Sequence, residues 1–154
     1  MAFGPDILKI DVERETERVV SFLREQVKTV YRRNGIVVGL SGGIDSAVMA
    51  ELAVRAFGAQ AVVGLILPER ESNPVSSSYA KAHAEKMGVA YREVDVTATV
   101  AGVMAYELRD DYIRTLVPEY APDCRYNISL PTDLLERESF SFYVLQVQLA
   151  DGTI

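Results

Sequence analysis

The chain has 154 residues, of which 49% are hydrophobic and 25% are charged, and its net charge is −6. This length and balance indicate one globular domain with a sizeable core, and the acidic charge argues against nucleic-acid binding. Cys124 is the single cysteine, which excludes an intramolecular disulfide, and no apolar run is long enough to span a membrane. We therefore expect a cytoplasmic protein without a nucleic-acid or membrane partner.

The first element that the sequence predicts is an amphipathic helix from Asp11 to Arg33. Apolar residues recur in this stretch near helical spacing, with charged residues between them. Asp11 is a suitable N-cap, and Asn34-Gly35 is a typical stop signal. The helix could cover a face of a sheet, or it could pair with a second subunit. The sequence leaves both interpretations open.

A strand over Ile36–Leu40 is followed by a glycine-containing turn and by a helix that begins near Ile44 and extends to Phe57. Two adjacent glycines, Gly42 and Gly43, allow a tight turn and let an anion approach the backbone. The free N–H groups and the positive dipole end of the next helix suit a phosphate or pyrophosphate.

Three side chains complete this turn. Ser41 and Ser46 would offer hydroxyl groups to the anion, and Asp45 would lie beside it. A carboxylate there is favourable mainly when a cation such as Mg²⁺ bridges it to the phosphates. Neither the Walker pattern nor the dinucleotide pattern matches, because the lysine of the first and the glycine spacing of the second are missing.

The next elements alternate between strand and helix. Continuous apolar residues predict a strand over Ala61–Leu67 that is covered on both faces. Asn73 would cap a helix that starts at Pro74 and stops at Gly88, and a third strand would span Tyr91–Thr97. This order predicts an α/β fold with a doubly wound parallel sheet, whose ligands bind at the carboxyl ends of the strands. The apolar helix after the turn should be largely buried.

The pattern S-G-G-x-D-S after a strand resembles the pyrophosphate loop of the N-type ATP pyrophosphatases. Together with Gly64–Glu69, Ser72–Pro74 and Val94–Thr97, it resembles the ammonia-dependent NAD synthetases over Val12–Gly102. The resemblance implies an adenine nucleotide alpha hydrolase-like fold that binds ATP, with Asp45 on Mg²⁺ and the second strand beside the adenine. The nucleotide-binding residues that it implies are Gly39, Leu40, Ser41, Gly42, Gly43, Ile44, Asp45, Ser46 and Leu67.

The reaction implied by this resemblance has two steps. The nicotinate carboxylate of deamido-NAD attacks the α-phosphate of ATP, and ammonia, free or supplied by a glutaminase, then displaces AMP to give NAD. The family also implies a homodimer. GMP synthetases, asparagine synthetases and sulfur transferases share the loop and remain alternatives, as does a nucleotide-binding or dimerising module without turnover. No catalytic residue is assigned, and His83 is expected to be a surface or packing residue.

The residues after Thr97 depart from the family pattern. They contain two glycines, Gly102 and Gly152, and no lysine. We expect a helix over Thr99–Val117, an irregular segment through Pro122, Cys124 and Pro131, and a strand over Phe140–Leu149. Because a turn at Asp151-Gly152 follows without a returning strand, we expect residues 98–154 to be a divergent or truncated region. With the helix over 11–33 and the nucleotide-binding part over 36–97, residues 1–154 are expected to form a single domain.

Overall fold

The computed structural model describes residues 9–130 and 143–154, which form two compact units, Met1–Ala98 and Thr99–Ile154. The start of the strand predicted over Phe140–Leu149 lies outside the described residues. None of the helices within the described ranges combines the length and the apolar content needed to cross a membrane.

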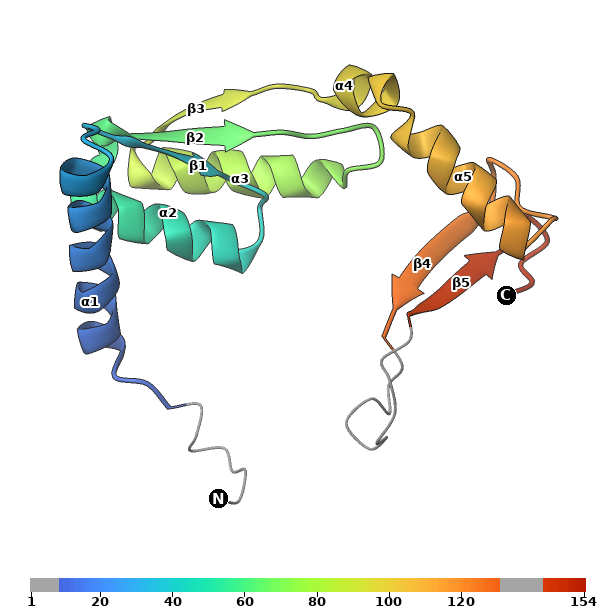
Figure 1. Cartoon of the computed structure of the whole chain (residues 1–154), viewed down its shortest axis with the longest axis horizontal. Coiled ribbons are helices and arrows are strands. Elements are labelled where there is room, and N and C mark those ends of the chain that lie inside the picture. The colour runs from blue at the N-terminus through green and yellow to red at the C-terminus, as the bar shows by residue number, and fades with distance from the viewer. Residues whose placement is uncertain (1–8, 131–142) are drawn as a thin grey trace. The chain divides into compact units, whose positions relative to one another are not determined.

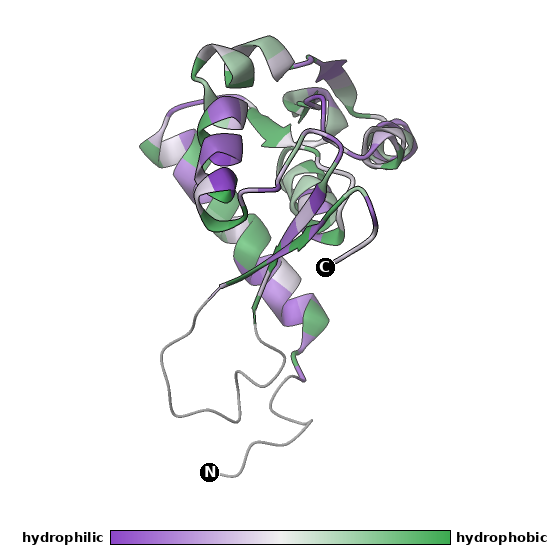
Figure 2. Ribbon diagram, turned by 90° about the vertical axis from the view of Figure 1, so that its right-hand side faces the viewer, coloured by the Kyte–Doolittle hydropathy of each residue, from purple (hydrophilic) through white to green (hydrophobic). Residues whose placement is uncertain are grey.

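The first unit begins with helix α1 (Val12–Arg24), which continues as a π-helical segment, η2 (Glu25–Val30). The side chain of Asp11 accepts a hydrogen bond from the N–H of Arg14 at 3.1 Å, so the predicted N-cap is confirmed. Hydrophobic and hydrophilic residues alternate along this helix (Figure 2), and Val20 and Val27 are its buried residues. The helix ends before Arg33, because η2 stops at Val30 and Arg32 has a φ of 51°.

The sheet of this unit has three parallel strands in the order β1 (Ile36–Gly39), β2 (Val62–Ile66) and β3 (Ala90–Glu93) (Figure 1). A short 3-10 helix, η3 (Ala59–Ala61), leads into β2. Hydrogen bonds continue beyond the strand ends, since the N–H of Val96 donates to the carbonyl of Pro68 at 2.9 Å. The prediction of three successive parallel strands is therefore confirmed.

Helices α2 (Ile44–Phe57) and α3 (Pro74–Met87) connect the strands and lie on the same face of the sheet (Figure 1). Their alanines pack together with the inward side chains of β2 and of the residue after β1. The buried cluster consists of Leu40, Ala50, Ile66, Ala80 and Ala84. Right-handed crossovers that proceed in one direction along a sheet place their helices on one face, which accounts for this arrangement.

Two burial predictions for this unit are wrong. The opposite face of β2 is not covered by the described residues, and Val63 is 39% exposed, while Val37 on β1 is 64% exposed. Helix α2 buries only its alanines, whereas Val48 and Met49 are about half exposed. The continuous apolar run over Ala61–Leu67 therefore predicted a parallel strand correctly. The described residues do not form the second covering layer that such a run usually indicates.

Helix α4 (Thr97–Gly102) begins at the end of the first unit and continues into the second. The second unit also contains α5 (Ala105–Leu116) and the antiparallel pair β4 (Arg125–Ser129) and β5 (Val144–Gln148). Its core cluster is Ile113, Tyr120 and Val147.

Two predictions in this unit are wrong. The helix expected over Thr99–Val117 is interrupted at Met104, which has a φ of 57°. The segment expected to be irregular contains β4, whose pairing with β5 depends on residues about twenty positions later in the chain. The sequence of β4 is mostly polar and gives little local signal for a strand. Its pairing with β5 stabilises it instead.

Candidate functional site

A network of local hydrogen bonds fixes the turn between β1 and α2. The Ser46 hydroxyl accepts a bond from the N–H of Ser41 at 3.2 Å and donates to the carbonyl of Gly43 at 3.0 Å. The Ser41 hydroxyl lies 3.1 Å from that of Ser46 and accepts a bond from the N–H of Gly43 at 3.3 Å. Both serines predicted to line the turn therefore also hold its shape, which is preorganisation of the kind that an anion site requires.

Gly42 is the position in this turn that does not tolerate a side chain. Its φ is 82°, and a Cβ at this position would lie 2.2 Å from the carbonyl oxygen of Ser76 in the first turn of α3. Gly43 has an ordinary φ of −89°, and a Cβ there would lie 3.4 Å from the Ser41 hydroxyl. The two adjacent glycines therefore have different functions, because only Gly42 needs both the backbone conformation and the close approach.

The amino end of α2 is open to a ligand. Gly43 is the N-cap, and no side chain within the described ranges caps the first turn. The N–H groups and the positive dipole end of the helix are therefore available to a negatively charged group. Asp45, in the same turn, is exposed.

The acidic residues that the structure describes do not gather into a metal site made by the protein alone. No group of three or more histidine, cysteine, aspartate or glutamate side chains comes together within residues 9–130 and 143–154. A single carboxylate beside the amino end of a helix is compatible with Mg²⁺ that is held partly by phosphate oxygens, since Mg²⁺ usually takes one or two carboxylates plus substrate phosphates.

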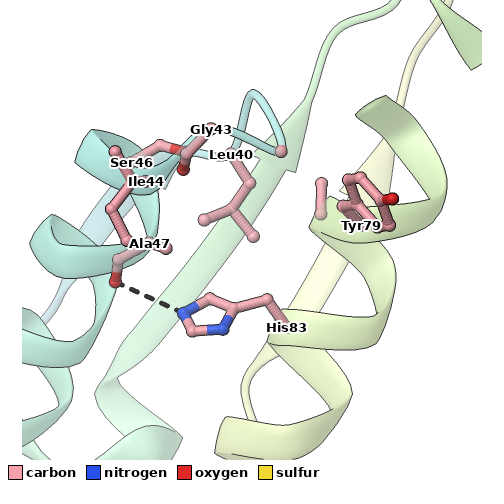
Figure 3. Close-up of a pocket in the computed structure, with 9 residues that line it drawn as sticks. Leu40, Gly43, Ile44, Ser46, Ala47, Tyr79 and His83 are labelled. Carbon is pink, nitrogen blue, oxygen red and sulfur yellow. Dashed lines mark hydrogen bonds between the residues drawn. The ribbon is translucent and has the colours of Figure 1, made fainter. Parts of the chain in front are cut away.

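A pocket of about 270 Å³ lies between the turn, α2 and α3 (Figure 3). His83 extends from α3 towards α2, and its Nε2 lies 3.3 Å from the carbonyl oxygen of Ala47. Tyr79, one turn before His83, lies at the same pocket. The lining residues are Leu40, Gly42, Gly43, Ile44, Ser46, Ala47, Tyr79, Ala80 and His83. His83 is thus half-buried and bonded, as expected for a packing residue, although it also faces the turn.

A second pocket, of about 200 Å³, lies at the carboxyl ends of β1 and β2 beside the start of α3. Hydroxyl groups are frequent on its walls. Its lining residues are Leu40, Ser41, Ile66, Leu67, Pro68, Ser72, Asn73, Ser76 and Ser77. This is the edge at which ligands bind in open parallel sheets.

The two pockets share Leu40 and together bring most of the residues implied by the resemblance to one place. Leu40, Gly42, Gly43, Ile44 and Ser46 line the first pocket, and Ser41 and Leu67 line the second. Gly39 and Asp45 line neither pocket.

The contribution of α3 to the first pocket was not predicted from the sequence. Tyr79 and His83 are four residues apart and therefore share a helix face, which was the available signal. Ser76 and Ser77 gave no comparable signal, because serines near a helix start are common.

The family model described as NAD synthase matches residues 15–121, which is more than half of the chain. The chain belongs to the NAD synthase family. An "NH(3)-dependent NAD(+) synthetase" of Rhizobium rhizogenes is 38% identical over 154 residues, which is 99% of this chain and 46% of that protein. The chain thus spans about half the length of the curated NAD synthetases that it matches.

Solved structures agree with this fold. The NH3-dependent NAD synthetase from Campylobacter jejuni superposes with a TM-score of 0.57 at 28% identity, over 64% of this chain and 42% of that one. NMN synthetase from Francisella tularensis also gives a TM-score of 0.57, at 23% identity over 73% of this chain and 52% of that one. The second likeness shows the fold alone. The chain therefore has the adenine nucleotide alpha hydrolase-like fold of the NAD synthase family.

Proposed function

We propose that the Ser41–Ser46 turn binds the pyrophosphate part of ATP, in a ligase that converts deamido-NAD to NAD with ammonia. The observation that carries this proposal is the uncapped amino end of α2 behind a turn that Ser41 and Ser46 hold rigid. Membership of the NAD synthase family supports the choice of reaction over those of GMP synthetases, asparagine synthetases and sulfur transferases.

The chemistry of the first step explains why the turn matters. When the nicotinate carboxylate attacks the α-phosphate of ATP, the bond between the α- and β-phosphates breaks and pyrophosphate leaves with additional negative charge. Fixed N–H donors and a helix dipole stabilise that developing charge without having to reorganise during the reaction. Ammonia then attacks the acyl carbon of the adenylate, AMP leaves, and a proton from nitrogen is lost to give the amide.

Asp45 would hold Mg²⁺, which neutralises the phosphate charge and favours departure of pyrophosphate when it is bound. The structure supports this assignment through the position of Asp45 in the exposed first turn of α2. Leu67 and the second pocket would accept the adenosine, because they lie at the carboxyl edge of the sheet beside Ser41.

We also propose that the protein acts as a homodimer in the cytoplasm, with ammonia arriving free or from a glutaminase. Exposed apolar residues on α1 and η2 favour self-association, since Phe22, Val30 and Tyr31 are each more than half exposed. Light scattering at micromolar concentration should give the mass of a dimer or larger. A monomer under those conditions would contradict this part of the proposal.

A titration of the chain with pyrophosphate and with Mg·ATP tests the binding function. Both are expected to bind, and adenosine without phosphates is expected not to displace pyrophosphate, because the turn contacts only the phosphate end. Failure of both pyrophosphate and Mg·ATP to bind would overturn the proposal.

Turnover is a separate question. The described residues would hold the pyrophosphate leaving group. A nicotinate carboxylate that the protein does not hold in line with the α-phosphate loses the rate benefit of orientation, which is worth roughly 7–11 kcal/mol. We therefore expect the 154 residues to release AMP and NAD at background rate with deamido-NAD, ammonia and Mg·ATP. Turnover at the rate of a complete synthetase would show that these residues also hold the acyl substrate.

A further inference from the structure

The turn between β1 and α2 rests on a second helix. A Cβ on Gly42 would lie 2.2 Å from the carbonyl oxygen of Ser76 and 2.9 Å from its Cα, so the backbone of the turn packs directly on the backbone of α3. Ser76 is the third residue of α3. Its position, and with it the support of the turn, depends on whether the first turn of α3 is formed.

Asn73 determines the conformation of that first turn. Its Oδ1 accepts a hydrogen bond from the N–H of Val75 at 3.0 Å, and its carbonyl oxygen accepts one from the N–H of Ser76 at 2.9 Å. Pro74 follows at the first helical position, where its fixed φ favours the helix. Helix starts fray when the cap is lost, because the first N–H groups then have no partner in the protein.

We propose that Asn73 is a positioning residue for the Ser41–Ser46 turn, and that it acts through the first turn of α3 rather than by touching the ligand. Removal of its side chain would loosen Ser76, and Gly42 would lose the surface against which it packs. The part of this proposal that concerns pyrophosphate affinity rests on the function proposed above. The mechanical link between α3 and the turn is independent of any ligand.

Three variants separate this role from its alternatives. Asn73→Ala removes the cap, and Asn73→Ser restores a hydroxyl cap without adding charge. Asp11→Ala is the matched control, because Asp11 caps α1 with an equivalent bond to Arg14 at 3.1 Å. The loss of either cap should lower the free energy of unfolding, measured by urea denaturation, by a similar amount.

The first measurement is amide hydrogen exchange at Ser41 and Gly43 in the full ligand-free chain, since both N–H groups bond within the turn. We expect Asn73→Ala to accelerate exchange at these two amides about three- to tenfold, and Asn73→Ser and Asp11→Ala to leave it near the wild-type rate. Unchanged exchange in Asn73→Ala, or equal acceleration in Asp11→Ala, would overturn the proposal, whether or not the chain binds a nucleotide.

The second measurement is the Kd for pyrophosphate. Asn73→Ala is expected to raise it about three- to tenfold, and Asn73→Ser to return it to within twofold of the wild type. Asn73 also lines the second pocket, so an Asn73→Ser variant that binds as poorly as Asn73→Ala would mean a direct ligand contact and would overturn the positioning role. A wild-type chain that does not bind pyrophosphate, with exchange at Ser41 and Gly43 still accelerated in Asn73→Ala, would contradict the proposed function alone.

Discussion

Gly42 before α2 and Gly58 after it have the same φ of 82°, but their surroundings differ. At the carboxyl end, a Cβ on Gly58 would meet nothing within 4 Å. There the guanidinium of Arg24 donates to the carbonyl oxygens of Ala56 at 2.9 Å and Arg55 at 2.8 Å. At the amino end, Gly42 packs on α3 and no side chain in the described ranges caps the helix. The carboxyl end is thus closed by the protein itself, whereas the amino end keeps its donors for a ligand.

The largest effect that separates the two ends is expected from Gly42→Ala. The substitution adds an unfavourable backbone conformation and a contact with the Ser76 carbonyl, so the turn must move. We expect the Kd for pyrophosphate in a calorimetric titration to rise by about thirtyfold or more, in line with loss of about 2 kcal/mol of preorganised donors.

Gly58→Ala is the matched control for that substitution. It has the same φ without the contact, and its ψ of 151° places it in a region that almost only glycine adopts. We expect it to lower the free energy of unfolding by about 1–3 kcal/mol and to leave the pyrophosphate Kd within twofold. Equal loss of affinity in both variants would remove the distinction between the two ends.

A smaller effect is expected from Ser46→Ala. The variant deletes the hydroxyl that bonds the Ser41 N–H and the Gly43 carbonyl, and we expect about tenfold weaker pyrophosphate binding in the same titration. Ser78→Ala is the control, since the Ser78 hydroxyl bonds only the Pro74 carbonyl of its own helix at 3.3 Å among the contacts described. If the Ser46 variant bound as well as the control, the network at the amino end would not matter for the anion.

Asp45→Asn should change the metal dependence of binding more than the affinity itself. A carboxylate near phosphates is repulsive without a cation, so the amide should reduce the Mg²⁺ dependence of ATP binding about threefold and improve metal-free binding. Titrations with and without Mg²⁺ measure both quantities. An unchanged Mg²⁺ dependence would indicate that Asp45 shapes the turn instead of holding the ion.

Changes at the carboxyl end of α2 should not affect the binding of pyrophosphate. Arg24→Met keeps the aliphatic stem and removes the two bonds to the end of α2. We expect urea denaturation to show a loss of about 1–2 kcal/mol in the free energy of unfolding, with no change in the Kd for pyrophosphate. Weakened pyrophosphate binding in this variant would show that the two ends are coupled through the helix.

Local sequence signals predicted the parts of the fold whose cause is local. The Asn73 cap, Pro74 at the first helical position and the stop at Gly88, with a φ of 67°, are all found as predicted. In contrast, β4 was missed and the break at Met104 was not foreseen. Strand β4 needs its pairing with β5, and the positive φ falls at Met104 and not at the nearby Gly102, where α4 ends.

The sequence by itself determined the strand, turn and helix around Ser41–Ser46, because two glycines, two hydroxyls and a β-branched run have strong local preferences. It could not determine which glycine is indispensable. That depends on the Ser76 carbonyl, which lies more than thirty residues away in sequence and touches the turn only after α3 has packed on the sheet. The placement of Tyr79 and His83 at the pocket has the same cause, since contacts between distant segments are set by the packing of helices on a common face and not by local preference.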